Sequence, residues 1–366
     1  MYQTEEIAAD RHEHSFTYPL PAYGAAVFKF QKPIENKKKK QEKKIDKRRS
    51  QEKMKQYAFG IDVGGTTVKA GLFDITGSLI EKWEIPTRTE DGGANILDDI
   101  ADTILNKMQE KSITQDVVLG IGIGIPGPVD EKGIVRGCVN LGWKDVELEY
   151  ELRNKTGLVV KAGNDANVAA LGECWKGAAQ GAKNSVMVTL GTGVGGGMVI
   201  GGKVLPGVHG ASGEIGHIKI SDTETEACNC GNTGCLEQFT SATGIVRMTK
   251  KELKESDLPS LLREKENITA KDVLDAAKAG DKLAEKILED TGDKLGKALS
   301  YISCVCDPEV FVIGGGVSRA GEILRASIEA GYQKYAFHAC KETKVVLATL
   351  GNDAGIYGSV KLLLNE

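Results

Sequence analysis

The densest group of reactive side chains in the sequence is a set of three cysteines that follows a histidine. Cys228, Cys230 and Cys235 fall within eight residues, and His217 lies eleven positions before the first of them. Three thiolates and one imidazole are the ligand set of a closed, four-coordinate structural zinc site. Three buried cysteines without a metal are the alternative, which this density of thiols makes the weaker interpretation. The other cysteines are scattered and are interpreted as core residues: Cys138, Cys174, Cys304, Cys306 and Cys340.

Two glutamates, Glu214 and Glu237, lie on either side of His217 and the cysteines. An imidazole that binds a metal through one nitrogen keeps its second nitrogen oriented and able to hydrogen-bond a hydroxyl group. Two carboxylates beside such an imidazole form a polar wall that suits a polyhydroxylated ligand. The alternative is that both glutamates lie on the surface, as most glutamates do.

An asparagine and an aspartate, Asn164 and Asp165, stand where an apolar strand pattern over residues 158–165 gives way to a helical pattern. A carboxylate at a helix N-terminus is stabilised in its ionised form. Asp165 therefore has two interpretations. Spacing alone favours a simple helix cap, and the sharper interpretation is a general base that accepts a hydroxyl proton during phosphoryl transfer.

Two strand–turn–strand patterns carry glycine and threonine in their turns, and their turns begin about 127 positions apart. Backbone N–H groups and hydroxyls in such turns can bind phosphate oxygens, because no side chain prevents close approach. Two such hairpins indicate a duplicated fold that holds a nucleotide between its halves, although ordinary hairpins are the alternative. The turn residues are Gly64, Gly65, Thr66 and Thr67 after a strand at 57–63, and Gly191, Thr192 and Gly193 after a strand at 185–190.

Further residues extend this nucleotide interpretation. Asp62 ends the first strand, where a carboxylate can hold hydrated Mg²⁺, and Lys69 adds a cation beyond the turn. A third glycine cluster follows a strand at 309–313 and precedes a helical pattern that starts at Ser318. A strand, a glycine turn and a helix bring backbone close to a flat or phosphorylated ligand, and simple strand-to-helix packing has equal weight. The cluster consists of Gly314, Gly315 and Gly316.

The elements that position these groups belong to a chain of 366 residues, 41% apolar and 27% charged, with a net charge of −4. This length predicts two domains, and the composition excludes a disordered, collagenous or disulfide-scaffold protein. No stretch approaches about 18 consecutive apolar residues, and the N-terminus lacks the basic start and apolar run of a secretory signal. We therefore expect a cytoplasmic enzyme that has no membrane partner.

The first 54 residues differ from the rest and are expected to form a partly disordered extension. Residues 37–53 hold ten Lys or Arg and three Asp or Glu, a net charge of +7. A solvated linker is the favoured interpretation over a nucleic-acid-binding arm, because neither aromatic residues nor a second basic patch accompany this run. Residues 15–30 predict one strand that weakly resembles the end of the C-terminal β-domain of α-amylase-family hydrolases. Residues 1–53 are a genuine extension, a fusion remnant or a misassigned start, and the sequence leaves these open.

Six motifs occur in order over about 310 residues from Tyr57 onward: DVGGTTVK (62–69), GIGIPGPVD (122–130), GNDANVAALGE (163–173), LGTGVGGG (190–197), GEIGH (213–217) and CNCGNTGCLE (228–237). Together they resemble the ROK family of sugar kinases and repressors. Three more segments are similar to the glucokinases of low-GC Gram-positive bacteria: IPTRTE (85–90), NLGW (140–143) and SATGIVR (241–247). The resemblance implies a two-lobed α/β fold of the ribonuclease-H-like, actin and hexokinase (ASKHA) type, with ATP in the interlobe cleft.

The resemblance also implies an activity and an organisation. The expected reaction is ATP-dependent phosphorylation of glucose at its 6-hydroxyl, with Mg²⁺ on ATP and a structural Zn²⁺, in a chain that forms a homodimer. Residues 55–168 and 349–366 would form a small lobe, to which residues 351–363 supply a helix, and residues 169–348 a large lobe with the zinc-binding loop. The alternatives are a kinase for fructose, mannose or N-acetylmannosamine, and a non-catalytic sugar-responsive regulator. The regulators of this family carry a winged helix-turn-helix before the first glycine turn. The residues that precede Gly64 in this sequence show no pattern of two amphipathic helices.

Carried over position by position, the resemblance assigns Asp165 the role of catalytic base. The implied glucose contacts are Asn164, Asp165, Glu214, His217 and Glu237. The ATP phosphates would lie on the turns at 64–67 and 191–193, and adenosine would lie near Gly314, Gly315 and Gly316. The implied zinc ligands are His217, Cys228, Cys230 and Cys235.

Overall fold

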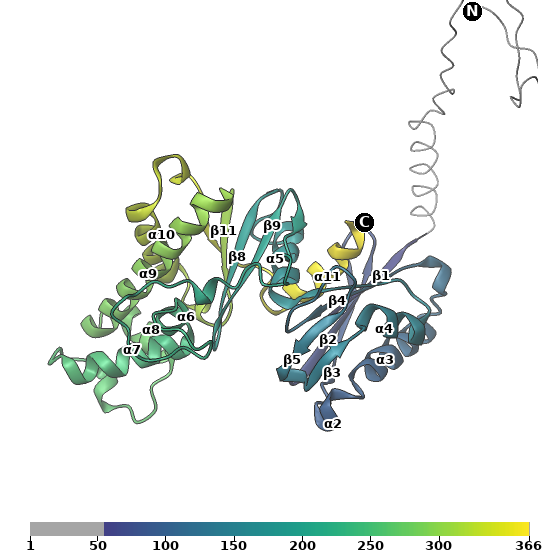
Figure 1. Cartoon of the computed structure of the whole chain (residues 1–366), viewed down its shortest axis with the longest axis horizontal. Helices are drawn as coiled ribbons and strands as arrows, with labels where there is room; N and C mark the ends of the chain where they lie inside the picture. The colour runs from purple at the N-terminus through teal and green to yellow at the C-terminus, as the bar shows by residue number, and fades with distance from the viewer. Residues whose placement is uncertain (1–54, 366) are drawn as a thin grey trace, which may run out of the picture. The chain divides into compact units, whose positions relative to one another are not determined.

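The computed structural model describes residues 55–365, so the predictions for residues 1–54 lie outside the described part of the chain (Figure 1). The first of two five-stranded sheets has the order β3-β2-β1-β4-β7. Strands β1, β2 and β3 pair antiparallel, and β4 and β7 continue the sheet parallel to β1. The strands are β1 (Tyr57–Val63), β2 (Thr67–Asp74), β3 (Leu79–Pro86), β4 (Val118–Ile125) and β7 (Val160–Asn164).

The second five-stranded sheet repeats this plan in the order β10-β9-β8-β11-β12. Its hairpin strands pair antiparallel, and β11 and β12 add parallel to β8. The strands are β8 (Ser185–Leu190), β9 (Val194–Ile200), β10 (Lys203–Val204), β11 (Val310–Gly314) and β12 (Lys344–Leu347). The repetition confirms the duplicated fold that the two glycine-threonine hairpins predicted.

Helices cover both faces of the first sheet. Its alternating apolar residues, such as Phe59 and Ile61, pack against α3 (Ile96–Glu110) and α4 (Leu148–Thr156). The opposite face packs against α11 (Ala354–Leu364) (Figure 1). This contact is close because β4 has Gly122 beneath the helix, where a Cβ atom would overlap the carbonyl oxygen of Ser359. The last helix of the described chain thus returns to the first sheet, and the lobe bounds at residues 168 and 349 stay predictions.

The second sheet is also covered on two faces. One face packs against a helical layer through the largest apolar core. The other face packs against α5 (Asp165–Lys176), whose Ala170 and Leu171 belong to one apolar cluster with residues of β8, β9 and β11. The helices of the layer are α6 (Glu237–Thr240), α7 (Ala242–Glu255), α8 (Ala270–Lys278), α9 (Lys282–Cys306) and α10 (Glu322–Tyr335).

Helices α5 and α11 pack closely on each other. A Cβ at Gly358 of α11 would overlap the Val168 carbonyl oxygen of α5, so only glycine permits this spacing. Because α5 contacts the second sheet and α11 the first, this helix pair joins the two halves. The shorter elements are α2 (Glu90–Gly93), β5 (Val135–Cys138), β6 (Trp143–Val146) and 3-10 helices at Gln115–Val117, Val139–Leu141, Ile215–His217, Leu261–Glu264, Val317–Ala320, His338–Cys340 and Gly351–Asp353.

Two local predictions need correction. The helix expected from Ser318 begins at Glu322, because residues 317–320 form a 3-10 turn that ends at Gly321 with a φ of 79°. Cys304 was interpreted as a core residue, but it lies on the exposed face of α9.

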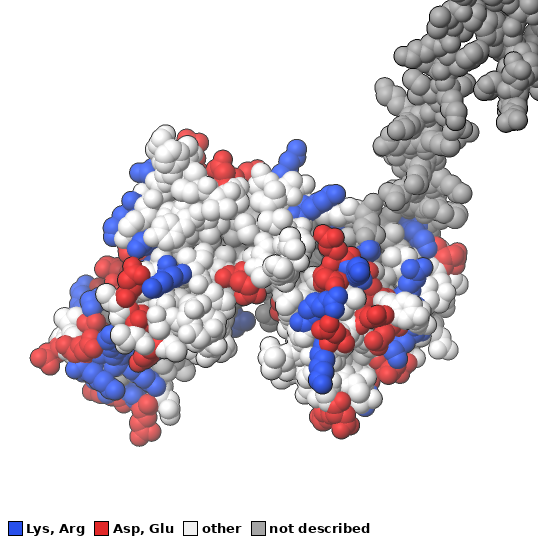
Figure 2. Space-filling view, viewed as in Figure 1, with Lys and Arg blue, Asp and Glu red and all other residues white. Residues whose placement is uncertain are grey.

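The surface charge of the described residues is mixed in sign. Figure 2 shows Lys and Arg intermixed with Asp and Glu over the face drawn. Ion pairs are common among the charged residues that the structure describes, such as the exposed pair of Lys271 with Asp275 at 2.6 Å. Such exposed pairs each contribute little to stability. None of the helices between residues 55 and 365 combines the length and the apolar character needed to span a membrane.

Candidate active site and metal centre

The junction of β7 and α5 places Asn164 and Asp165 in different roles. Asn164 is the helix cap, since its Oδ1 accepts hydrogen bonds from the N–H groups of Ala166 at 3.1 Å and Asn167 at 3.2 Å. Its Nδ2 donates to the Gly127 carbonyl oxygen at 3.2 Å. Asp165 is the first helical residue, and its Oδ1 accepts a hydrogen bond from the Ala166 N–H at 2.8 Å. The helix cap is therefore Asn164 and not Asp165, for which this role was considered from the sequence.

The environment of Asp165 disfavours its ionised form. Burial raises the pKa of the Asp165 carboxyl to about 6, and the nearby negative charges of Asp62 and Glu214 act in the same direction. Burial likewise raises the pKa of Asp62, whereas the Lys69 ammonium group, 3.7 Å from its Oδ2, opposes this increase. Two half-buried carboxylates therefore interact through their charges, and the pKa of the one at the helix terminus is raised to about 6. Such a group suits general base catalysis.

The first glycine turn is held from the side by Thr87. The Thr87 hydroxyl donates to the Gly64 carbonyl oxygen at 2.7 Å, and the Thr87 N–H donates to the Thr66 carbonyl oxygen at 3.0 Å. Gly65 and Thr66 themselves are exposed. The turn thus has a fixed backbone with accessible N–H groups at its tip, as a phosphate-binding turn requires.

The second glycine turn is held by the helices that follow the cysteine loop. The Ala242 N–H donates to the Gly191 carbonyl oxygen and the Thr243 hydroxyl donates to the Thr192 carbonyl oxygen, both at 2.8 Å. The Val194 N–H, just after the turn, donates to Glu237 Oε2 at 2.9 Å. The turn and the N-termini of α6 and α7 therefore form one hydrogen-bonded unit.

One cavity of 680 Å³ brings together several of the predicted residues from both halves of the fold. Asp62 and Lys69 line it from the first half, Asp165 from α5, and Gly315 and Gly316 from the turn after β11. Met187, Thr189 and Leu347 add apolar and hydroxyl surface. A cavity of this size and polarity can hold a nucleotide beside the Asp165 carboxylate.

Other predicted residues lie outside this cavity lining in the described part of the chain. Asn164 lines a neighbouring cavity of 270 Å³ instead. The remaining ones are the two glycine turns at 64–67 and 191–193, together with Gly314, Glu214, His217 and Glu237.

Sequence reasoning missed one wall of the cavity. Residues 350–355, which end the connection from β12 and begin α11, line it together with Lys82 and Arg319. The glycine-rich start of GNDAGIYG (351–358) is a weak signal for such a wall. Neither Lys82 nor Arg319 stands in a pattern that distinguishes it from surface lysines and arginines.

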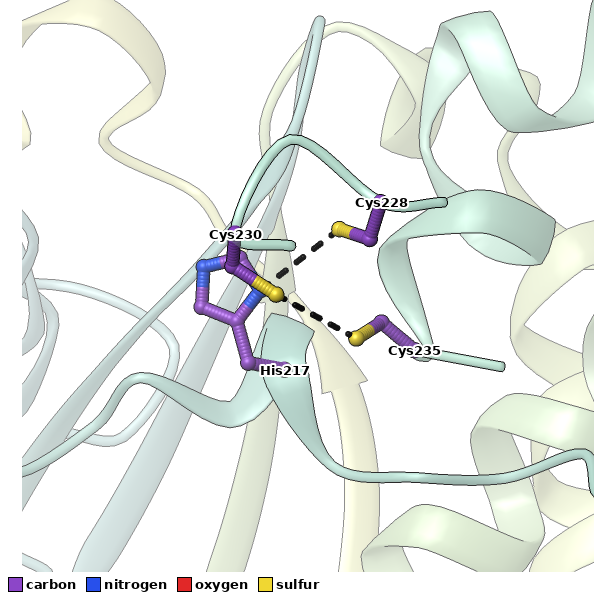
Figure 3. Close-up of side chains that lie close together, drawn as sticks. All are labelled: His217, Cys228, Cys230 and Cys235. Carbon is purple, nitrogen blue, oxygen red and sulfur yellow. Dashed lines mark hydrogen bonds between the residues drawn. The ribbon is translucent and has the colours of Figure 1, made fainter. Parts of the chain in front are cut away.

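The predicted metal ligands converge at one point (Figure 3). The ligand atoms of His217, Cys228, Cys230 and Cys235 all lie within 4.8 Å of one another. Cys230 Sγ lies 3.6 Å from Cys235 Sγ, and Cys228 Sγ lies 3.8 Å from His217 Nδ1. Metal–ligand bonds of about 2.3 Å for sulfur and 2.0–2.1 Å for nitrogen give tetrahedral edges of roughly 3.5–3.8 Å, so the four residues fit Zn²⁺.

A tight backbone loop produces this convergence. The Cys228 N–H donates to the Asn232 carbonyl oxygen at 2.7 Å, and the Gly231 N–H donates to the Cys228 carbonyl oxygen at 2.8 Å. Gly231 and Gly234 have φ angles of 88° and 77°, which favour glycine. The loop therefore turns sharply enough for thiols close in sequence to face one ion.

Sequence reasoning also missed the arginine that fastens this loop. Arg247 of α7 donates to Glu224 at 2.7 Å and to Glu226 at 2.9 Å, and both glutamates precede Cys228 in the loop. It also donates to the Gln238 carbonyl oxygen at 3.1 Å. The half-buried guanidinium group thus ties the cysteine loop to α6 and α7.

The sugar-binding residues proposed from the resemblance lie beside the metal ligands. His217 presents Nδ1 to the thiols, and its Nε2 lies 3.9 Å from Glu214 Oε2. The Cys228 thiol lies 4.0 Å from Glu237 Oε1. The two imidazole nitrogens therefore lie near different groups, Nδ1 near the Cys228 thiol and Nε2 near the Glu214 carboxylate.

Comparisons with known proteins agree with this architecture. Residues 58–366 match the ROK family. The chain is 44% identical over 307 residues to a glucokinase of Halalkalibacterium halodurans, covering 82% of this chain and 93% of the relative.

Solved structures give the same result. A ROK family glucokinase from Streptomyces griseus in complex with glucose and AMPPNP superposes with a TM-score of 0.67 at 31% identity, covering 85% of this chain and all of the other (100%). A ROK family transcriptional regulator, a homologue of the Escherichia coli MLC protein, gives a TM-score of 0.75 at 30% identity, covering 84% of this chain and 78% of the regulator. The fold is thus the two-lobed α/β fold of these kinases, and the chain belongs to the ROK family.

Proposed function

We propose that this chain is an ATP-dependent glucokinase, which transfers the terminal phosphoryl group of ATP to the 6-hydroxyl of glucose. The observation that carries the proposal is the single cavity that contains both the Asp165 carboxylate and the backbone of Gly315 and Gly316. The 44% identity to the H. halodurans glucokinase supports the same activity. So does the likeness to the S. griseus enzyme, which was solved with glucose and AMPPNP.

Asp165 is the general base of the proposed reaction. Its carboxylate accepts the proton of the sugar 6-hydroxyl while that oxygen attacks the terminal phosphorus in line and ADP leaves. A pKa of about 6 keeps most of the group ionised at neutral pH while leaving it basic enough to accept a proton.

Hydrogen bonds from the neighbouring polar groups orient the sugar in this proposal. The Asn164 amide uses one N–H on the Gly127 carbonyl oxygen, which leaves its second N–H for a sugar hydroxyl. Glu214 and Glu237 accept from hydroxyls, and His217 offers its Nε2. Asp165 also contacts the hydroxyl from which it takes the proton. Such orientation lowers the entropic part of the barrier.

The ATP phosphates lie on the N–H groups of the turns at 64–67 and 191–193, and Lys69 adds positive charge. Adenosine lies against the turn of Gly314, Gly315 and Gly316. Asp62 would hold hydrated Mg²⁺, which when bound neutralises part of the phosphate charge. His217 and the three cysteines would hold Zn²⁺, which fixes the imidazole and the loop.

We also propose the two lobes as the moving parts: residues 55–168 with 349–366, and residues 169–348. Their closure would exclude water, whose attack on ATP is the competing reaction. A homodimer is part of the same proposal, and sedimentation velocity at several concentrations tests it.

Steady-state kinetics with purified, zinc-replete chain and MgATP test the proposed activity. Glucose, fructose, mannose and N-acetylmannosamine are compared as acceptors, and product is measured as ADP and as sugar phosphate. We expect kcat/KM for glucose to exceed the others by a hundredfold or more, about 2.7 kcal/mol of transition-state discrimination. A higher kcat/KM for one of the other sugars than for glucose would change the proposed substrate to that sugar. No turnover with any sugar would contradict the kinase and favour the regulator.

A further inference from the structure

A buried carboxylate without an assigned role, that of Glu173, lies two turns along α5 from Asp165. The Glu173 side chain has an exposure of 0%. Its donors are backbone N–H groups and one hydroxyl. Oε1 accepts from the N–H groups of Thr349 at 3.1 Å and Leu350 at 2.8 Å. Oε2 accepts from the Ala178 N–H at 2.7 Å and, more weakly, from the Thr349 hydroxyl at 3.4 Å.

The partners of Glu173 begin the segment that forms the missed wall of the cavity. Leu350 lines the cavity itself, and Thr349 joins it to Leu347 and Ala348, which also line it. Two backbone N–H groups at consecutive positions are thus fixed by one carboxylate from α5. The same helix carries Asp165 at its first position. Helix α5 therefore positions both the proposed base and the cavity wall.

The far end of the same wall contacts the residues near the phosphate site. Lys69 Nζ donates to the Asn352 carbonyl oxygen at 3.3 Å. Gly355 lies so close to Asp62 that a Cβ there would come within 2.7 Å of its Oδ2. A shift of the wall would therefore disturb Asp62 and Lys69 as well as the surface that faces the nucleotide.

The energetics favour a specific role for the carboxylate. Burying an ionised group is costly, and hydrogen bonds to charged acceptors are stronger than those between neutral groups. The backbone leaves space for it, because Gly177 stands where any Cβ would overlap Glu173 Oε2. A neutral amide at the same place would turn an NH₂ group towards backbone donors, which repel it.

We propose that Glu173 is a positioning residue for ATP: it holds the backbone of Thr349 and Leu350, and through them the wall at 350–355, against the nucleotide. This inference rests on the proposed kinase function for the identity of the ligand. It assigns Glu173 no contact with substrate.

The test compares Glu173→Gln with a matched control, Glu309→Gln. Glu309 is also a carboxylate that fixes two consecutive backbone N–H groups, those of Lys183 at 2.8 Å and Asn184 at 3.0 Å, but it lies outside the cavity lining. AMPPNP affinity is measured by calorimetry, and KM is measured separately for ATP and for glucose. Amide hydrogen exchange is followed in peptides that cover residues 344–353.

We expect Glu173→Gln to weaken AMPPNP binding and to raise KM for ATP by about tenfold or more. KM for glucose should stay within about twofold of the parent, and the amides of Thr349 and Leu350 should exchange faster. Glu309→Gln should leave AMPPNP affinity unchanged. Should Glu173→Gln fail to fold, Glu173→Asp keeps the charge on a shorter side chain and decides by the same measurements.

A Glu173 variant that is less stable but binds AMPPNP as the parent does would overturn the proposal, because the carboxylate would then only support the fold. Failure of the proposal for Glu173 can be distinguished from failure of the proposed glucokinase function. A parent chain that binds AMPPNP but phosphorylates no sugar would contradict the glucokinase and leave the comparison of Glu173 with Glu309 intact.

Discussion

The carboxylate of Glu237 accepts a hydrogen bond from the backbone N–H of Val194 at 2.9 Å, which joins the cysteine loop to the second glycine turn. The other oxygen of the same carboxylate lies 4.0 Å from the Cys228 thiol. A Cβ at Gly193 would overlap Glu237 Oε2, so glycine is required for this contact. The metal centre and a proposed phosphate-binding turn are therefore neighbours through one side chain. Disorder in the cysteine loop should therefore weaken the binding of both glucose and ATP.

Replacement of a metal ligand tests this connection. Cys230→Ser should lose bound zinc, and it should weaken glucose binding and raise KM for ATP, since His217 and Glu237 both lose their support. We expect each affinity to fall by about tenfold or more. Zinc is measured by atomic absorption, and glucose binding by calorimetry.

The control for this variant is Cys304→Ser, which removes an exposed thiol outside the metal cluster. It should keep a full complement of zinc and unchanged kinetics. A zinc-free Cys230→Ser chain that binds glucose as tightly as the parent would disprove the support role of the metal centre.

Removal of the proposed base should separate turnover from binding. Asp165→Asn should lower kcat by about 10²–10⁴-fold, the usual contribution of a general base, while calorimetric glucose affinity changes little. The matched control is Asp281→Asn, since Asp281 also stands at a helix N-terminus and accepts from the N–H groups of Leu283 and Ala284, both at 3.1 Å. Full activity of Asp165→Asn would rule out its role.

The raised pKa of Asp165 predicts the pH dependence of the reaction. Because only the carboxylate form can accept a proton, kcat/KM for glucose should be constant above about pH 7 and fall about tenfold per pH unit below its pKa of about 6. An ordinary aspartate, with a pKa of 3.8, would keep activity to a much lower pH. Initial rates in constant-ionic-strength buffers measure the profile.

A second variant tests the cause of this pKa. Glu214 contributes part of the increase through its negative charge, so Glu214→Gln should move the acidic limb to lower pH, whatever it does to the affinity for glucose. An acidic limb that stays in place would show that the charge of Glu214 does not contribute to the raised pKa of Asp165, which would leave burial and the charge of Asp62 as its causes.

Features that depend on neighbouring residues could be predicted from the sequence. The hairpins of β1 with β2 and of β8 with β9 follow from an apolar run, a glycine turn and a second apolar run. The cysteine loop is equally local, because its three thiols lie within eight residues of each other. In these cases the residues that interact are also close in sequence, so spacing carries the information.

Features that depend on distant partners could not be predicted. Glu173 and Thr349 are 176 positions apart, and nothing in either segment indicates their contact. Asn164 and Asp165 are both suitable caps, and only the backbone geometry decides that Asn164 has this role. The start of α10 was misplaced because Gly321 adopts a positive φ between a 3-10 turn and the helix. Tertiary contacts and local backbone angles therefore account for what the sequence left open.

The glycines beneath α11 predict a stability effect at a distance from the proposed site. Gly122→Ala should destabilise the fold by about 1–3 kcal/mol or more, because its methyl group would overlap the Ser359 carbonyl oxygen and push α11 from the first sheet. Activity should fall with the fraction of folded protein. It should fall further if the displaced α11, which packs on α5, shifts the cavity wall. Urea denaturation followed by circular dichroism measures the free energy of unfolding.

Gly65→Ala is the control for stability, because an added Cβ there meets nothing within 4 Å. This variant should be as stable as the parent and should lose only affinity for ATP. Equal stability of Gly122→Ala and the parent would contradict the close packing of α11 on β4.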